Sequence, residues 1–144
     1  VSMDVDVPAH ANGVLHRDLK PSNILVRDSD QQPLILDFGN AYVLDDLDQA
    51  SLTSTAVGSI GYIPPEVLAD PKVRSPLQDV YAAAVLTYEL IARRRPNPLE
   101  YEPLQPAFST PAALDATIRR ALGPAGQRPQ TVAILRREFA AIAF

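Results

Sequence analysis

The chain has 144 residues, of which 47% are hydrophobic and 21% are charged, and its formal net charge is −4 at pH 7. These values are typical of a globular domain that buries its own core, and the acidic balance argues against a nucleic-acid-binding surface. Cysteine is absent, which excludes disulfides, thiolate nucleophiles and cysteine–zinc sites, and no apolar run is long enough to span a bilayer. We therefore expect a cytoplasmic chain without a membrane segment and without a nucleic-acid partner.

The first third of the chain is dominated by strand-like patterns. Residues 1–8 alternate between apolar and polar side chains, which is the period of a strand. Residues 24–26 and 34–36 are short apolar runs separated by a polar turn, and this pattern predicts a small β-hairpin. Residues 40–60 show no sustained period and are expected to form a loop.

The remainder of the chain predicts helices. Residues 79–93 are apolar nearly all round, which is typical of a helix inside a helical core. Residues 111–122 and 130–143 each carry one apolar face, and Gly123 is a good stop for the first of them. The expected fold class is therefore mainly α with one small hairpin.

Two motifs flank the predicted hairpin and carry the chemistry. Residues 16–23 read His-Arg-Asp-Leu-Lys-Pro-Ser-Asn, and residues 37–39 read Asp-Phe-Gly. Phosphoryl transfer requires a carboxylate to orient a hydroxyl, a cation near the moving phosphate and oxygen ligands for Mg²⁺, and these motifs supply all three. Together they resemble the large, C-terminal lobe of protein kinases, in particular the bacterial eukaryotic-like Ser/Thr kinases.

The resemblance implies a role for each polar residue of the two motifs. Asp18 would orient or accept the proton of the substrate hydroxyl, and Lys20 would contact the γ-phosphate of ATP. Asn23 and Asp37 would hold Mg²⁺, or Mn²⁺ in its place. Ser22 would lie near the phosphates, and Leu25 would pack under the adenine. His16 and Phe38 would be packing residues, Arg17 would indicate activation by phosphorylation of the loop, and Gly39 would complete the Asp-Phe-Gly turn.

The substrate class also follows from the resemblance. Lys20 is the residue that Ser/Thr kinases use at its position, and Ser59 stands where such kinases carry Thr or Ser. A protein with a Ser or Thr acceptor is therefore the expected substrate, in preference to an antibiotic or choline. Thr53 and Thr55 are candidate phosphorylation sites of the activation segment, although no Lys or Arg lies between Phe38 and Gly58 to receive a phosphate.

Three further residues are implied to be structural. The activation segment would span residues 37–66 and end at Glu66, which would form a buried ion pair with Arg128. Asp79 would anchor the backbone of the catalytic loop. A plain helix N-cap is the alternative interpretation of Asp79, and the two roles can coexist.

Some elements of the family pattern are not found in these 144 residues. The chain contains no Gly-x-Gly-x-x-Gly loop, and neither the ATP-pairing lysine of the small lobe nor its partner glutamate has a candidate. We therefore expect residues 9–144 to be a kinase C-terminal lobe preceded by a non-family leader, residues 1–8. As a truncated or interrupted kinase it would have little activity alone, and a noncatalytic binding module or a truncated-gene relic are the alternatives.

A missing small lobe would also leave apolar surface uncovered. Leu25, Leu36 and Phe38 are the residues that this surface would contain. The sequence therefore predicts marginal stability or self-association through this face.

Overall fold

The computed structural model describes residues 15–36 and 60–143. In these ranges the chain is mostly helical and carries one two-stranded antiparallel sheet, which confirms the predicted fold class at this level. The leader and the candidate site residues of the metal turn and activation segment lie outside the described residues; these are residues 1–8, Asp37, Phe38, Gly39, Thr53, Thr55 and Ser59.

The hairpin follows directly on a short 3₁₀ helix, η1 (Pro21–Asn23). Strand β1 (Ile24–Val26) pairs antiparallel with β2 (Pro33–Ile35), and the register places Leu25 opposite Leu34. The second strand begins and ends one residue earlier than predicted, because Pro33 occupies the first strand position, where its missing N–H is tolerated.

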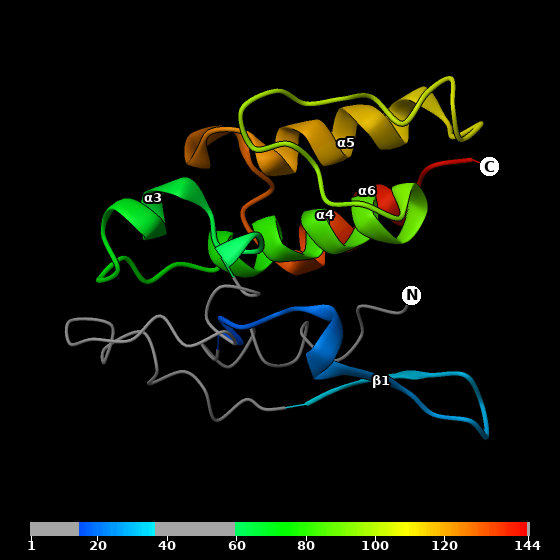
Figure 1. Ribbon diagram of the computed structural model, residues 1–144, viewed down its shortest axis with the longest axis horizontal. Coiled ribbons are helices and arrows are strands. Elements are labelled where there is room, and N and C mark those ends of the chain that lie inside the picture. The colour runs from blue at the N-terminus through cyan, green and yellow to red at the C-terminus, as the bar shows by residue number, and fades with distance from the viewer. Residues whose placement is uncertain (1–14, 37–59, 144) are drawn as a thin grey trace.

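The longest helix, α4 (Leu77–Ala92), lies at the centre of the molecule. Every residue from Gln78 to Leu86 is buried, as expected for a core helix. Figure 1 shows the hairpin segment on one side of α4 and α5 on the other, while α6 overlaps α4 in this view. The helix begins two residues before the predicted start, so Asp79 lies in its first turn and the N-cap interpretation of Asp79 is wrong.

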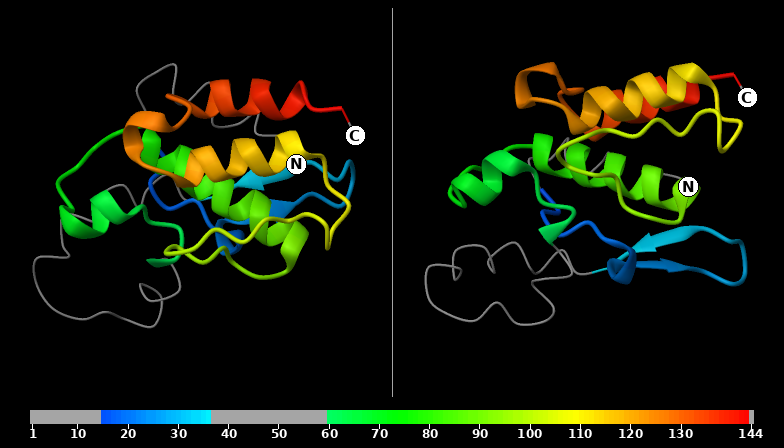
Figure 2. Two further views of the ribbon diagram at one scale, coloured as in Figure 1. Left: turned by 90° about the horizontal axis from the view of Figure 1, so that it is seen from above. Right: turned by 45° about the horizontal axis from the view of Figure 1, so that its top comes forward.

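Helices α5 (Ala112–Leu122) and α6 (Val132–Ala140) form the layer that covers α4, and Figure 2 shows them side by side above it. Both are shorter than predicted. Pro111 is the N-cap of α5 with an extended ψ of 140°, and α6 starts after Thr131, whose hydroxyl accepts a hydrogen bond from the Ile134 N–H (3.2 Å).

Besides η1, two short elements were not predicted, namely α3 (Pro65–Ala69) and the 3₁₀ helix η4 (Ala125–Gln127). Each follows a proline and is too short to show a helical period. Among the described residues, no helix has the length and hydropathy needed to cross a membrane.

Candidate active site

The start of the loop at residues 16–23 is fixed by a carboxylate from the core helix. Asp79 of α4 is fully buried, and its two oxygens accept hydrogen bonds from the backbone N–H groups of His16 (2.9 Å) and Arg17 (2.8 Å). Arg17 has a left-handed φ of 65°, a conformation that costs a non-glycine residue free energy. The hydrogen bonds from Asp79 therefore hold the loop in a shape that its own backbone disfavours.

The imidazole of His16 is buried and links the loop to the end of the hairpin. Its Nε2 lies 3.0 Å from the Leu36 carbonyl oxygen, and its Nδ1 lies 3.3 Å from the Asp18 backbone N–H. A carbonyl can only accept and an N–H can only donate, so these contacts fit a neutral ring protonated on Nε2. His16 thus acts here as a packing and positioning residue of the loop.

The loop at residues 16–23 brings together the side chains of Asp18, Lys20 and Asn23. The Asn23 Nδ2 donates to the backbone oxygen of Asp18 (2.8 Å) and to its Oδ2 (3.0 Å). The Lys20 ammonium lies 3.0 Å from the same Oδ2. Asn23 is 8% exposed and the Asp18 side chain 20% exposed, so the cluster is shielded but open on one side.

This hydrogen bonding leaves two oxygen atoms of the cluster without a donor. Both contacts to the Asp18 carboxylate use Oδ2, and the Asn23 amide is turned so that its nitrogen faces Asp18. In residues 15–36 and 60–143 no hydrogen-bond donor reaches Asp18 Oδ1 or Asn23 Oδ1. Carboxylate and amide oxygens are the ligands that Mg²⁺ prefers, so the donor set fits such an ion.

A second ion pair connects α3 to the turn before α6. Arg128 is 3% exposed, and its guanidinium makes a bidentate contact with Glu66 at 2.5 and 3.0 Å. Its Nε donates to the Gly123 carbonyl oxygen (2.8 Å), and it lies 5.0 Å from the centre of the Tyr81 ring. Burial, the largest single influence, raises the pKa of Glu66, but the hydrogen bonds from Arg128, a backbone hydrogen bond and the charge of Arg128 together lower it.

The other described residues that the family resemblance assigns to nucleotide binding are exposed. Ser22 lies in η1, and Leu25 is 53% exposed on the hairpin, where Leu36 is also exposed at 39%. The exposure of Leu25 and Leu36 agrees with the expected uncovered apolar surface. Phe38, the third residue expected in this surface, lies outside the described residues.

Sequence reasoning missed a polar contact between the turn before α3 and helix α4. The Tyr62 hydroxyl donates to the Glu89 carboxylate of α4, and the Arg95 guanidinium lies 5.8 Å from the centre of the Tyr62 ring. Burial and the contact with Glu89 raise the pKa of Tyr62. These residues lie 27 positions apart, and no local pattern in the sequence signals their pairing.

The family model of the protein kinase domain matches residues 8–110 of this chain. The chain therefore belongs to the protein kinase family. The match includes the loop at residues 16–23 and helix α4, so the cluster around Asp18 lies inside the kinase domain.

Known protein kinases from several kingdoms are similar to the chain. Serine/threonine-protein kinase PkaA of Streptomyces coelicolor is 35% identical over 133 residues, which is 90% of this chain and 22% of that protein. The leucine-rich repeat receptor-like protein kinase PEPR2 of Arabidopsis thaliana is 48% identical over 82 residues, 57% of this chain and 7% of that protein. The putative serine/threonine-protein kinase/receptor R831 of Acanthamoeba polyphaga mimivirus is 36% identical over 99 residues, 68% of this chain and 6% of that protein. The chain thus spans less than a quarter of the length of each of these relatives.

Proposed function

We propose that this chain is the catalytic, C-terminal-lobe portion of a protein Ser/Thr kinase, which transfers the γ-phosphoryl group of ATP to a Ser or Thr hydroxyl of a protein. The observation that carries the proposal is the cluster of Asp18, Lys20 and Asn23, held in place by the buried Asp79. The proposed lobe spans residues 9–144, with residues 1–8 as a leader. The cytoplasmic location and the self-association through the hairpin face stay predictions.

In the proposed reaction, Asp18 acts on the substrate hydroxyl. Its Oδ1 has no donor among the described residues and can accept the hydroxyl hydrogen, which orients the oxygen for attack. Asp18 would take the proton as the bond from this oxygen to the γ-phosphorus forms and the bond from the γ-phosphorus to the leaving oxygen of ADP breaks. Lys20 lies 3.0 Å from Asp18, so its ammonium can reach an oxygen of the same phosphoryl group. MgATP supplies the activated phosphoryl group when it is bound.

Asn23 and Asp37 are the proposed ligands of Mg²⁺, or of Mn²⁺. Two hydrogen bonds fix the Asn23 amide, so its Oδ1 is oriented before any ion arrives. Ser22 would face the phosphates, and the exposed Leu25 would pack under the adenine. Thr53, Thr55 and Ser59 keep their predicted regulatory and substrate-contacting roles as part of this proposal.

Binding of Mn²⁺ with ATP tests the proposed site in this chain directly. We expect MnATP to broaden the NMR signals of the Asn23 side-chain amide and the Ser22 backbone amide before those of α5 or α6. The Asn23→Ala substitution removes a ligand and should weaken MnATP binding about tenfold or more. Asn97→Ala, in the loop after α4, is the matched control and should bind like the unsubstituted chain. Equal affinity of Asn23→Ala and the unsubstituted chain would contradict the assignment.

The proposal includes low activity for the 144 residues alone. They contain no Gly-x-Gly-x-x-Gly loop, and positioning of the phosphates accounts for most of the catalysis in phosphoryl transfer. Stable MnATP binding with negligible transfer is therefore the expected behaviour. If the chain instead fails to bind any nucleotide, a noncatalytic module becomes the better account.

A further inference from the structure

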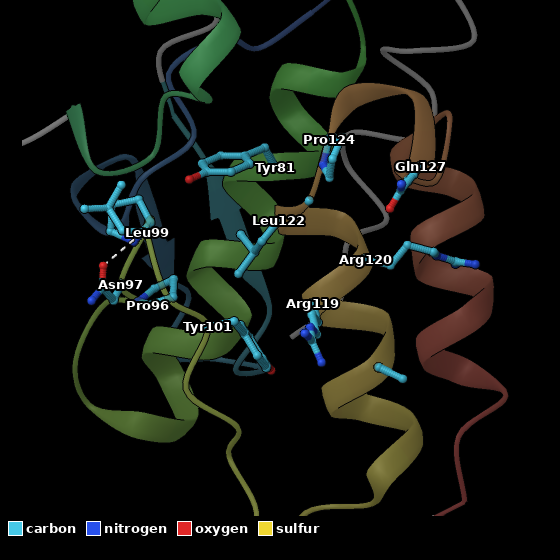
Figure 3. Close-up of a pocket in the computed structure, with 13 residues that line it drawn as sticks. Tyr81, Pro96, Asn97, Leu99, Tyr101, Arg119, Arg120, Leu122, Pro124 and Gln127 are labelled. Carbon is cyan, nitrogen blue, oxygen red and sulfur yellow. Dashed lines mark hydrogen bonds between the residues drawn. The ribbon is translucent and has the colours of Figure 1, made fainter.

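A hollow near the C-terminal helices has no residue of the Asp18 cluster in its lining. Its volume is about 490 Å³, and it is bounded by the loop at residues 96–101, the end of α5 and the turn at residues 123–127. Figure 3 shows Leu99 and Pro96 on one wall, Leu122 and Arg119 on the other, and Tyr81 between them. We call this hollow the α5 groove. Its size falls in the range of known ligand sites, about 300–1,000 Å³.

The walls of the α5 groove are fixed by side-chain hydrogen bonds. Asn97 Oδ1 accepts a hydrogen bond from the Leu99 N–H (3.0 Å), which holds the turn that presents Leu99 (Figure 3). The Tyr101 hydroxyl donates to Asp115 of α5 (2.7 Å), and the same carboxylate accepts from the Leu104 N–H (2.7 Å). These hydrogen bonds attach the loop to α5, so the groove exists before a ligand binds. Little conformational entropy would therefore be lost in ordering the loop on binding.

The groove carries positive charge on a chain that is acidic overall. Its described lining contains Arg119 and Arg120 and no acidic residue, whereas the formal net charge of the chain is −4. Arg120 is paired with Glu138 of α6, and Figure 3 shows it pointing away from the groove. Arg119 is exposed, and none of the ion pairs in the described part of the chain includes it.

The apolar part of the groove is also uncovered. Leu99 is 95% exposed at the rim, on the turn that contains the hydrogen bond from its N–H to Asn97. Leu122 and Pro96 are half-buried below it, and Tyr81 closes the floor. An exposed leucine beside an aromatic ring and a cation forms a surface that an apolar side chain next to a carboxylate would complement.

We propose that the α5 groove is a docking site for an acidic peptide segment of a partner protein, with a leucine-type side chain seated between Leu99, Tyr81 and Leu122 and a neighbouring carboxylate bound by Arg119. The carboxylate would make a charge-assisted, bidentate hydrogen bond with a guanidinium that is available for it. The inference goes beyond the proposed phosphoryl transfer and does not depend on it, because no residue of the Asp18 cluster lines the groove.

The test measures peptide binding to the full 144-residue chain by fluorescence anisotropy. The probe is a labelled eight-residue peptide in which two leucines are flanked by aspartates. We expect it to bind, and we expect the same peptide with lysines in place of the aspartates, or alanines in place of the leucines, to bind at least about tenfold more weakly. NMR shifts on binding should centre on residues 96–101 and 116–127.

Two variants with matched controls locate the site. Arg119→Glu should weaken binding about tenfold or more, whereas Arg137→Glu, the same charge change on the exposed face of α6, should not. Leu99→Ala should weaken binding about fivefold to tenfold, whereas Leu68→Ala, at an exposed leucine of α3 outside the groove, should not. Both test residues are exposed, so the variants should melt like the unsubstituted chain.

Three results would overturn the proposal. The first is no binding of the acidic leucine peptide, and the second is binding that Arg119→Glu and Leu99→Ala leave unchanged. The third is equally tight binding of N-acetyl aspartate alone, which would make the groove an anion site and not a peptide site. None of these results bears on nucleotide binding at Asn23, so failure here is distinguishable from failure of the proposed kinase function.

Discussion

The Arg128→Met substitution is expected to lower the free energy of unfolding by about 3 kcal/mol, the lower end of the range for breaking a buried ion pair. The substitution leaves the Glu66 carboxylate and the Gly123 carbonyl without the donors that now contact them. The Glu66 side chain is 32% exposed, so water can reach it and relieve part of the cost. Urea unfolding measures the change. Arg137→Met, at an exposed arginine of α6, is the control and should change stability by less than about 0.5 kcal/mol.

The same ion pair makes the free energy of unfolding depend on pH, and the Glu66→Gln variant should lose this dependence. Burial raises the pKa of Glu66, but the hydrogen bonds from Arg128 lower it below its ordinary value of 4.5 in the folded chain. Because the folded pKa is the lower one, the stabilisation is present above the unfolded pKa and disappears as the pH falls through the folded value. The difference in unfolding free energy between the unsubstituted chain and Glu66→Gln should therefore shrink below about pH 4.5. A difference that is the same at pH 7 and pH 3 would contradict this account.

The Asp79→Ala substitution is expected to release the loop at residues 16–23 and to cost about 3 kcal/mol of stability, since each hydrogen bond to a charged group contributes about 1.5–3 kcal/mol. The backbone N–H groups of His16 and Arg17 lose their acceptors, and the left-handed φ of Arg17 loses its support. Amide hydrogen exchange should accelerate at His16 and Arg17, and MnATP binding should weaken because Asn23 no longer has a fixed partner in Asp18.

Asp28→Ala provides the control for Asp79. Asp28 is an exposed carboxylate in the hairpin turn, and its removal should leave both stability and exchange at Arg17 unchanged. Asp79→Asn keeps one acceptor oxygen and removes the charge, so its stability should lie between that of Asp79→Ala and that of the unsubstituted chain. Unchanged exchange at both loop amides in Asp79→Ala would contradict the anchoring role.

The contiguous catalytic motif was the most predictable part of the site. Asp18, Lys20 and Asn23 lie within six positions, and a tight loop followed by a 3₁₀ helix brings them together with little help from the rest of the fold. The burial of α4 was equally predictable, because a helix that is apolar nearly all round has no face to offer to solvent.

Other features depend on tertiary packing that no local pattern encodes. The Arg128–Glu66 pair spans 62 positions and was expected only through the family resemblance, while the Tyr62–Glu89 contact was not expected at all. Polar pairs of this kind form wherever the packing of α3, α4 and η4 places a donor beside an acceptor. Helix ends also shifted by one to three residues. Pro76 and Pro111 are the N-caps of α4 and α5, and α6 ends at Ala140, three residues before its predicted end.

The most direct test of the central claim is phosphoryl transfer by a chimera. The segment of Streptomyces coelicolor PkaA that precedes the matched region would be joined to residue 9 of this chain, and transfer from ATP to Ser/Thr peptides would be measured with and without Asp18→Asn. We predict that the chimera phosphorylates Ser or Thr and that Asp18→Asn lowers the rate about 10²–10⁴-fold, the usual contribution of a positioned acid–base group. Transfer that is unaffected by Asp18→Asn, or a chimera that binds MnATP at Asn23 and still transfers nothing, would contradict the account.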